Sequence, residues 1–161
     1  MTLADNLALV RDRIHRAALA AGRDPAAVAL VAVTKTWPAS AVRDAYALGL
    51  RDFGENYAQE FVEKAEALAD LAELRWHFIG HLQTNKARVV APRAAAVHTV
   101  DTAKLAHELG LRAAAAGRVV EALVQVSVAG EAQKSGCAPA DVADECDAVA
   151  REPALRLRGL M

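Results

Sequence analysis

Lysine is rare in this 161-residue chain, and one of the five lysines, Lys35, stands at the end of the apolar run Val28–Val33. An amine at the mouth of a dry protein interior loses the solvation of its ammonium form, which lowers its pKa. A neutral lysine amine is a nucleophile that forms Schiff bases with carbonyl compounds. The alternative at this point is a lysine that reaches solvent from the end of a strand.

Polar residues also follow the other apolar segments. Gly54–Tyr57 (GENY), Gly80–Lys86 (GHLQTNK) and Asp101–Thr102 each come directly after a predicted strand. In parallel α/β folds, functional groups gather at the C-terminal ends of the strands. We therefore expect these segments to meet at one end of the molecule.

Other chemistries find little support. His77 and His81 have an i, i+4 spacing, but WHFIGH reads as strand and loop, and no third ligand is placed near them. We therefore expect no metal; His77 is interpreted as a hydrogen-bonded core residue and His81 as a pocket-lining residue. No G-x-G-x-x-G, P-loop or G-x-S-x-G pattern occurs. The two cysteines, Cys137 and Cys146, read as reduced structural thiols.

Periodicity predicts that strands and helices alternate along the chain. An amphipathic helix begins at Leu3 and ends before Gly22. Predicted strands follow at 28–33, 50–54, 76–79, 96–100, 121–128 and 155–160, with helices at 38–48, 57–74, 84–90, 102–116 and 139–151. This order indicates βαβ units and a parallel sheet, either doubly wound or part of a (β/α)₈ barrel.

Composition limits the partners. The chain is 54% hydrophobic and 24% charged, with a net charge of −1, which is typical of one globular domain. The charge balance gives no basic surface for nucleic acid or for an anionic membrane. Neither a signal peptide nor a membrane span is recognisable, so we expect a cytoplasmic protein.

Several segments together resemble the pyridoxal-phosphate homeostasis protein family, which is related to the N-terminal barrel domain of alanine racemase. The matching segments are Val31–Thr36 (VAVTKT), Phe53–Glu60 (FGENYAQE), Trp76–Lys86 (WHFIGHLQTNK), His98–Asp101 (HTVD), Gln125–Val128 (QVSV) with Lys134–Gly136 (KSG), and Arg158–Met161 (RGLM). The resemblance extends from the first helix to the last residue.

This resemblance implies an α/β fold of the (β/α)₈ TIM-barrel type with an extra N-terminal helix, forming a single domain over residues 1–161. It implies pyridoxal 5'-phosphate (PLP) held as a Schiff base on Lys35, with Asn56, His81 and Met161 also in the cofactor pocket. Glu55, Gln83, Asn85 and Lys86 match positions that order loops, without a chemical role. Members of the family continue through a seventh and an eighth strand, so the barrel is expected to be incomplete after the sixth.

The function implied by the resemblance is a non-catalytic role in intracellular PLP homeostasis, in a monomer that releases the cofactor to apo PLP-dependent enzymes. Three alternatives stay open: an amino-acid racemase, a Schiff-base aldolase that uses Lys35 directly, and a chain that binds nothing. Racemisation needs acid–base groups on both faces of the bound substrate. The only tyrosines are Tyr46 and Tyr57, and neither matches the opposing tyrosine of alanine racemase, which weighs against that enzyme.

Overall fold

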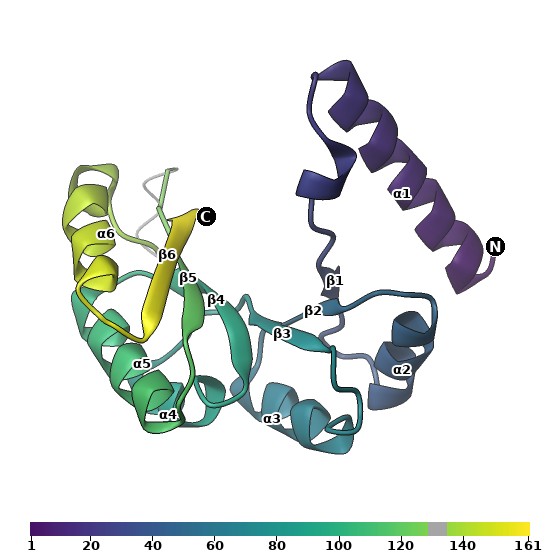
Figure 1. Ribbon diagram of the computed structural model, residues 1–161. Coiled ribbons are helices and arrows are strands. Elements are labelled where there is room, and N and C mark those ends of the chain that lie inside the picture. The colour runs from purple at the N-terminus through teal and green to yellow at the C-terminus, as the bar shows by residue number, and fades with distance from the viewer. Residues whose placement is uncertain (129–134) are drawn as a thin grey trace.

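The computed structural model describes residues 1–128 and 135–161. Six parallel strands form one sheet in the order β1-β2-β3-β4-β5-β6 (Figure 1). The strands are β1 (Ala32–Val33), β2 (Asp52–Glu55), β3 (Arg75–Phe78), β4 (Ala94–Val100), β5 (Val120–Val124) and β6 (Leu155–Leu160). Each strand therefore pairs with its neighbours in sequence, and all six C-terminal ends lie on the same side.

Helical segments connect the strands. They are α1 (Leu3–Ala20), η1 (Pro25–Ala27), α2 (Ala39–Ala47), α3 (Ala58–Ala67), η2 (Thr84–Lys86), α4 (Ala87–Val90), α5 (Ala103–Ala115), η3 (Pro139–Asp141) and α6 (Val142–Ala150). Thr2 caps α1 through a capping box with Asp5, and Thr102 caps α5. Among the described residues, no helix combines the length and apolarity that a membrane crossing requires.

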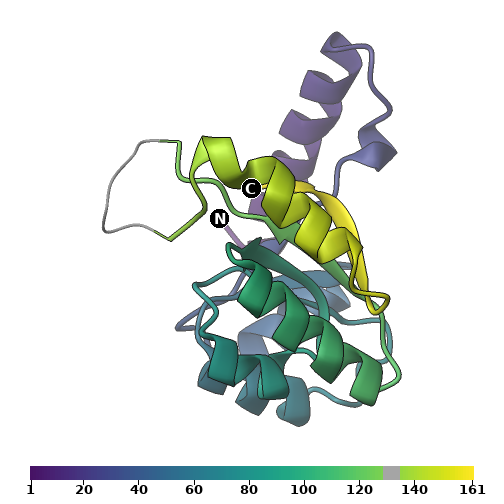
Figure 2. The same ribbon diagram turned by 90° about the vertical axis from the view of Figure 1, so that its left-hand side faces the viewer.

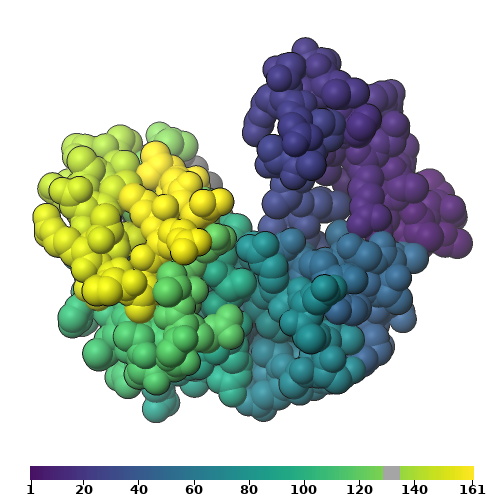
Figure 3. Space-filling model, in the orientation of Figure 1, coloured from purple at the N-terminus to yellow at the C-terminus, as the bar shows by residue number. Residues whose placement is uncertain are grey.

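The sequential strand order and the position of the helices match the architecture of a (β/α)₈ barrel. Six of its eight strands are present in the described residues, and the sheet is not closed. Helices α2 to α6 cover the outer face of the curved sheet, as Figures 1 and 2 show. A doubly wound sheet would carry helices on both faces. The edge strands β1 and β6 do not pair with each other. Figure 3 accordingly shows a hollow between β6 and the N-terminal segment of α1 and η1.

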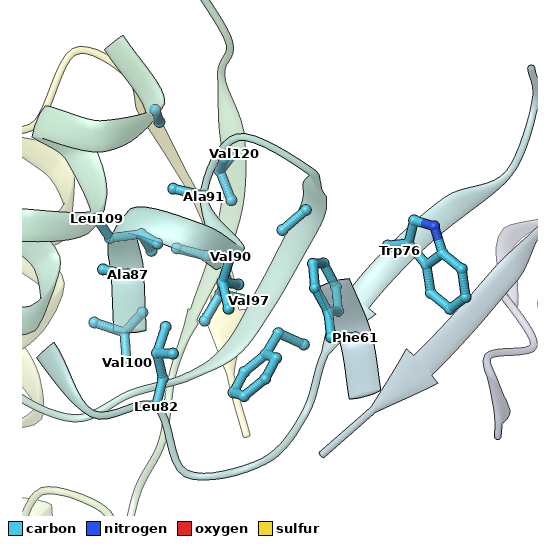
Figure 4. Close-up of a cluster of buried hydrophobic side chains, with 14 of the residues drawn as sticks. Phe61, Trp76, Leu82, Ala87, Val90, Ala91, Val97, Val100, Leu109 and Val120 are labelled. Atoms are coloured by element: carbon cyan, nitrogen blue, oxygen red, sulfur yellow. The ribbon is translucent and has the colours of Figure 1, made fainter. Parts of the chain in front are cut away.

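The core lies between the sheet and its outer helices (Figure 4). Phe61 of α3 is fully buried and meets Trp76 and Phe78 of β3 edge-on, with ring centroids 5.8 and 5.9 Å away. Val97 and Leu109 continue the same layer toward α5. Apolar packing of this kind, roughly 25 cal/mol per Å² buried, stabilises the βα units and so fixes the strand ends.

Three predicted elements are longer than the observed ones. The strand predicted at 28–33 is reduced to β1, because β2 begins at Asp52, opposite residue 31, and leaves residues 28–30 without a partner. The helix predicted at 57–74 ends at Ala67. Eighteen helical residues would extend roughly 27 Å, far beyond the neighbouring four-residue strand, so residues 68–74 form turns instead. The strand predicted at 121–128 ends at Val124.

Candidate functional site

The four residues predicted for the cofactor pocket all follow the C-terminal ends of strands. Lys35 comes after β1, Asn56 after β2 and His81 after β3, and these three strands are neighbours. Met161 follows β6 at the opposite edge of the sheet, where its backbone bonds Val124 and Val126 and its side chain is exposed. The fold therefore groups three of the residues on adjacent strands and places the fourth across the open sheet.

The environment predicted for Lys35 is wrong in one respect. The residue is exposed rather than set at the mouth of a dry interior. The cause is that β1 is an edge strand, since β2 is its one neighbour, and even Val33 is 49% exposed. Lys35 is therefore in contact with solvent, where its side chain is accessible to a ligand.

The backbone around Lys35 is held in an unusual turn. Thr36 has a φ of +67°, a left-handed conformation that costs a β-branched residue free energy. On the other side of Lys35, Thr34 is buried, and its N–H donates to the carbonyl oxygen of Gly54 in β2 over 3.0 Å. The N–H of Trp37 closes the turn on the carbonyl oxygen of Thr34, also over 3.0 Å.

A buried ionic network lies beneath this turn. Lys64 Nζ donates to Glu55 Oε1 over 2.7 Å, to Thr34 O over 2.7 Å and to Glu60 Oε1 over 3.2 Å. Glu60 Oε1 also accepts the N–H of Thr36 over 2.8 Å, and Glu55 Oε1 accepts the Thr34 hydroxyl over 2.7 Å. We call Glu55, Glu60 and Lys64 the Lys35 clamp. Glu55 is completely buried and Lys64 is 5% exposed.

Two members of the Lys35 clamp, Glu60 and Lys64, were assigned no role from the sequence. Glu55 was assigned a loop-ordering role. The sequence nevertheless indicated that Lys64 would be buried. Lys64 lies three residues after Phe61 and four before Leu68, so it falls on the apolar face of α3. A lysine on a buried face needs charged and polar partners to offset its desolvation.

Asn56 and His81 line the same cavity. It has a volume of about 320 Å³, and its wall also includes Tyr57, Phe78 and Lys86. Asn56 Oδ1 is buried and has no hydrogen-bond partner. His81 is exposed, with Nδ1 3.7 Å from Asp101 Oδ2. Asn56, which carries this unpaired acceptor, follows β2, the strand that neighbours β1 and the turn of Lys35.

His77 is a hydrogen-bonded core residue, as the sequence predicted. Its Nε2 lies 2.8 Å from Asp52 Oδ1, and its Nδ1 lies 2.9 Å from His98 Nε2. Burial lowers the pKa of His98, and neighbouring His77 adds to the effect, while Glu121 opposes it. Across residues 1–128 and 135–161, no cluster of three or more potential metal ligands occurs. Lys134, part of a motif used in the sequence analysis, lies outside the described residues.

Comparison with known proteins extends these findings. Residues 3–161 match the family model described as alanine racemase, N-terminal domain. The pyridoxal phosphate homeostasis protein of Pseudomonas aeruginosa is 54% identical over 160 residues, which cover 99% of this chain and 69% of the relative. PipY of Synechococcus elongatus, 38% identical, has been solved without and with PLP bound. The first structure gives a TM-score of 0.85 and covers 99% of this chain and 70% of that one; the second gives 0.77, with 92% and 68%.

Proposed function

The chain belongs to the alanine racemase N-terminal domain family and, within it, to the pyridoxal phosphate homeostasis proteins, and from this premise we propose that it binds PLP on Lys35 as a Schiff base. The observation that carries the proposal is the pairing of an accessible lysine with a buried, unpartnered amide oxygen at adjacent strand ends. Lys35 follows β1 and Asn56 follows β2, and the Thr34–Gly54 hydrogen bond joins the two ends.

The residues present fit this cofactor. PLP supplies an aldehyde that condenses with a primary amine, and the exposed Lys35 amine can reach a ligand from solvent. Asn56 Oδ1 can accept a hydrogen bond from a bound group, which would satisfy a buried acceptor that is otherwise unpaired. His81 borders the same cavity as Asn56 and can contact a ligand there. We propose that Met161, which follows β6, also contacts the bound cofactor.

We further propose that the protein is a carrier without turnover. Tyr46 is engaged elsewhere, because the Arg51 guanidinium lies 4.0 Å over its ring at the end of α2. Tyr57 is 60% exposed and borders the same cavity as Asn56, so it is the tyrosine that a racemase reaction could use, and we propose that it does not act in this way. A carrier of this kind would buffer a reactive aldehyde in the cytoplasm and release it to apo PLP-dependent enzymes. It would act as a monomer, in which residues 1–161 belong to one PLP-binding barrel domain that is incomplete after the sixth strand.

The test is a titration of the 161-residue chain with PLP, followed by borohydride reduction and peptide mapping. We expect an absorbance band typical of a PLP Schiff base and a reduced adduct on the peptide that contains Lys35. Lys104→Ala, which removes an exposed lysine on α5, is the control and should leave the adduct unchanged. An adduct distributed evenly over the lysines, or none, would contradict the assignment.

Two further measurements separate the alternatives. Deuterium exchange at the Cα of alanine in the presence of PLP would indicate racemase chemistry, and its loss in Tyr57→Phe would assign the acid–base group. Borohydride trapping of a sugar ketone in the absence of PLP would instead indicate an aldolase. We expect neither reaction.

A further inference from the structure

We propose that the Lys35 clamp is a positioning device that fixes the backbone on both sides of Lys35 and so presents its amine for reaction with PLP. The proposal rests on the proposed function, because it concerns the same lysine. It assigns this role to Glu55, Glu60 and Lys64, none of which lines the cavity of Asn56 and His81.

The residues on both sides of Lys35 are hydrogen-bonded to the same helix. Lys64 Nζ holds the carbonyl oxygen of Thr34, and Glu60 Oε1 holds the N–H of Thr36, so the residues before and after Lys35 are each tied to α3. Lys64 has three N–H groups and three acceptors, which are Thr34 O, Glu55 Oε1 and Glu60 Oε1. Each N–H group of Lys64 therefore has an acceptor, and one of these acceptors belongs to the turn.

The backbone of Thr36 is in the left-handed conformation. A left-handed residue with a branched side chain persists where its surroundings over-determine it, and such residues cluster at functional sites. Here the over-determining contact is the charge-assisted hydrogen bond to Glu60. Glycine would adopt this φ freely, so the choice of threonine makes the turn depend on the Lys35 clamp.

Charged side chains rather than apolar ones occupy this region beneath the turn. A buried ion pair stabilises a protein no better than well-packed apolar residues of similar volume. The neighbouring Phe61 and Phe53 already fill the core below α3 and β2. Apolar side chains at positions 55, 60 and 64 could cover this region, but they could not bond Thr34 O or Thr36 N. The charges are therefore explained by the turn rather than by the core.

Glu60 offers the sharpest test, because its side chain is partly exposed and a substitution there should not unfold the chain. Glu60→Ala removes the acceptor of Thr36, whereas Glu60→Gln keeps an oxygen at the same place. We expect Glu60→Ala to weaken PLP affinity by about tenfold, the effect of losing one hydrogen bond to a charged group. Glu60→Gln should restore most of this affinity.

A readout without the cofactor accompanies the titration. Hydrogen exchange at the Thr36 amide, followed by NMR in the PLP-free protein, should become faster in Glu60→Ala and return toward the wild-type rate in Glu60→Gln. Thr102→Ala, which removes the N-cap of α5, is the control for a general loss of stability and should change neither the Thr36 amide nor PLP affinity.

The outcomes are distinct. Wild-type PLP affinity in Glu60→Ala, or an unchanged Thr36 amide, would overturn the positioning role. Equal losses of affinity in Glu60→Ala and Glu60→Gln would also overturn it, because they would implicate charge rather than the hydrogen bond. A wild-type protein that forms no adduct on Lys35 would contradict the proposed function, and the exchange measurement would still decide whether the clamp fixes the turn.

Discussion

Gly80 packs directly against the backbone of Asn56, so closely that a Cβ on Gly80 would overlap the Asn56 carbonyl oxygen and lie 2.7 Å from its Cα. Gly80 follows β3, and Asn56 follows β2 and lines the cavity together with His81. On its other side, the Gly80 carbonyl oxygen accepts a 2.6 Å hydrogen bond from the buried hydroxyl of Thr99 in β4. This contact holds the ends of three strands together.

Gly80→Ala should therefore displace Asn56. Because the obstructing atoms belong to the backbone, the strain cannot be relieved by a side-chain rotation, and we expect a loss of about 1–3 kcal/mol in the free energy of unfolding together with weaker PLP binding. Urea unfolding and a PLP titration would check this. The control is Gly117→Ala, a site with open space around the glycine but a φ of +65°, where stability should fall and PLP affinity should not.

Thr36→Gly and Thr36→Pro should differ strongly in their effect on stability. Glycine accepts the left-handed φ, so relief of strain offsets the added freedom of the unfolded chain, and stability should stay within about 1 kcal/mol of the wild type. Proline requires a φ near −65° and has no N–H for Glu60, so it should cost about 3 kcal/mol or more. Thermal or urea unfolding distinguishes them, and equal effects would refute the strained-turn interpretation.

Phe61→Ala should be among the most damaging core substitutions. The ring is fully buried between Trp76 and Phe78, so its removal loses apolar burial and leaves a cavity, at a cost of about 3–5 kcal/mol. Val33→Ala, at a position that is 49% exposed, should change the free energy of unfolding by less than about 1 kcal/mol. Comparable losses in the two variants would mean that α3 does not anchor the core.

Acid should destabilise the protein partly through His98. Its pKa in the folded state lies below the ordinary value of 6.5, first because of burial and then because of His77. The unfolded chain therefore binds the proton more readily, and the stability that His98 contributes is complete above pH 6.5 and is lost as the pH falls toward the folded pKa. The charged groups of this network include Asp52, Arg75, Glu121 and Arg158. In His98→Gln, urea unfolding between pH 7.5 and 5.5 should show a shallower loss, and an identical pH dependence would refute the assignment.

Cys137 should react slowly with alkylating agents. Burial raises the pKa of its thiol, and the carboxylate of Glu145 adds to the effect, so little thiolate is present near neutral pH. Mass spectrometry after iodoacetamide treatment should find Cys137 unmodified in the folded chain and modified in urea. Rapid labelling of Cys137 in the native protein would show that this part of the fold opens readily.

The sequence by itself determined the order of the elements, the parallel sheet and the polar segments that directly follow the strands. Periodicity and strand-ending polar segments are local properties, and for that reason β6, α5 and the α1 helix were predicted nearly to the residue. The resemblance supplied the family and the cofactor, and it selected Lys35 and Asn56 from a chain in which position alone left several roles open.

Only the tertiary structure decided the surroundings of those residues. Whether Lys35 is dry or exposed depends on the number of neighbours that β1 has, which the apolar run itself does not encode. The salt bridge between Lys64 and Glu55 joins residues of α3 and β2. The hydrogen bond from Lys64 to the Thr34 carbonyl oxygen joins residues that are thirty positions apart in the sequence. Such contacts form because the packing of helices on a parallel sheet brings together polar groups that are far apart in the sequence. A local sequence pattern does not predict which of these groups will meet.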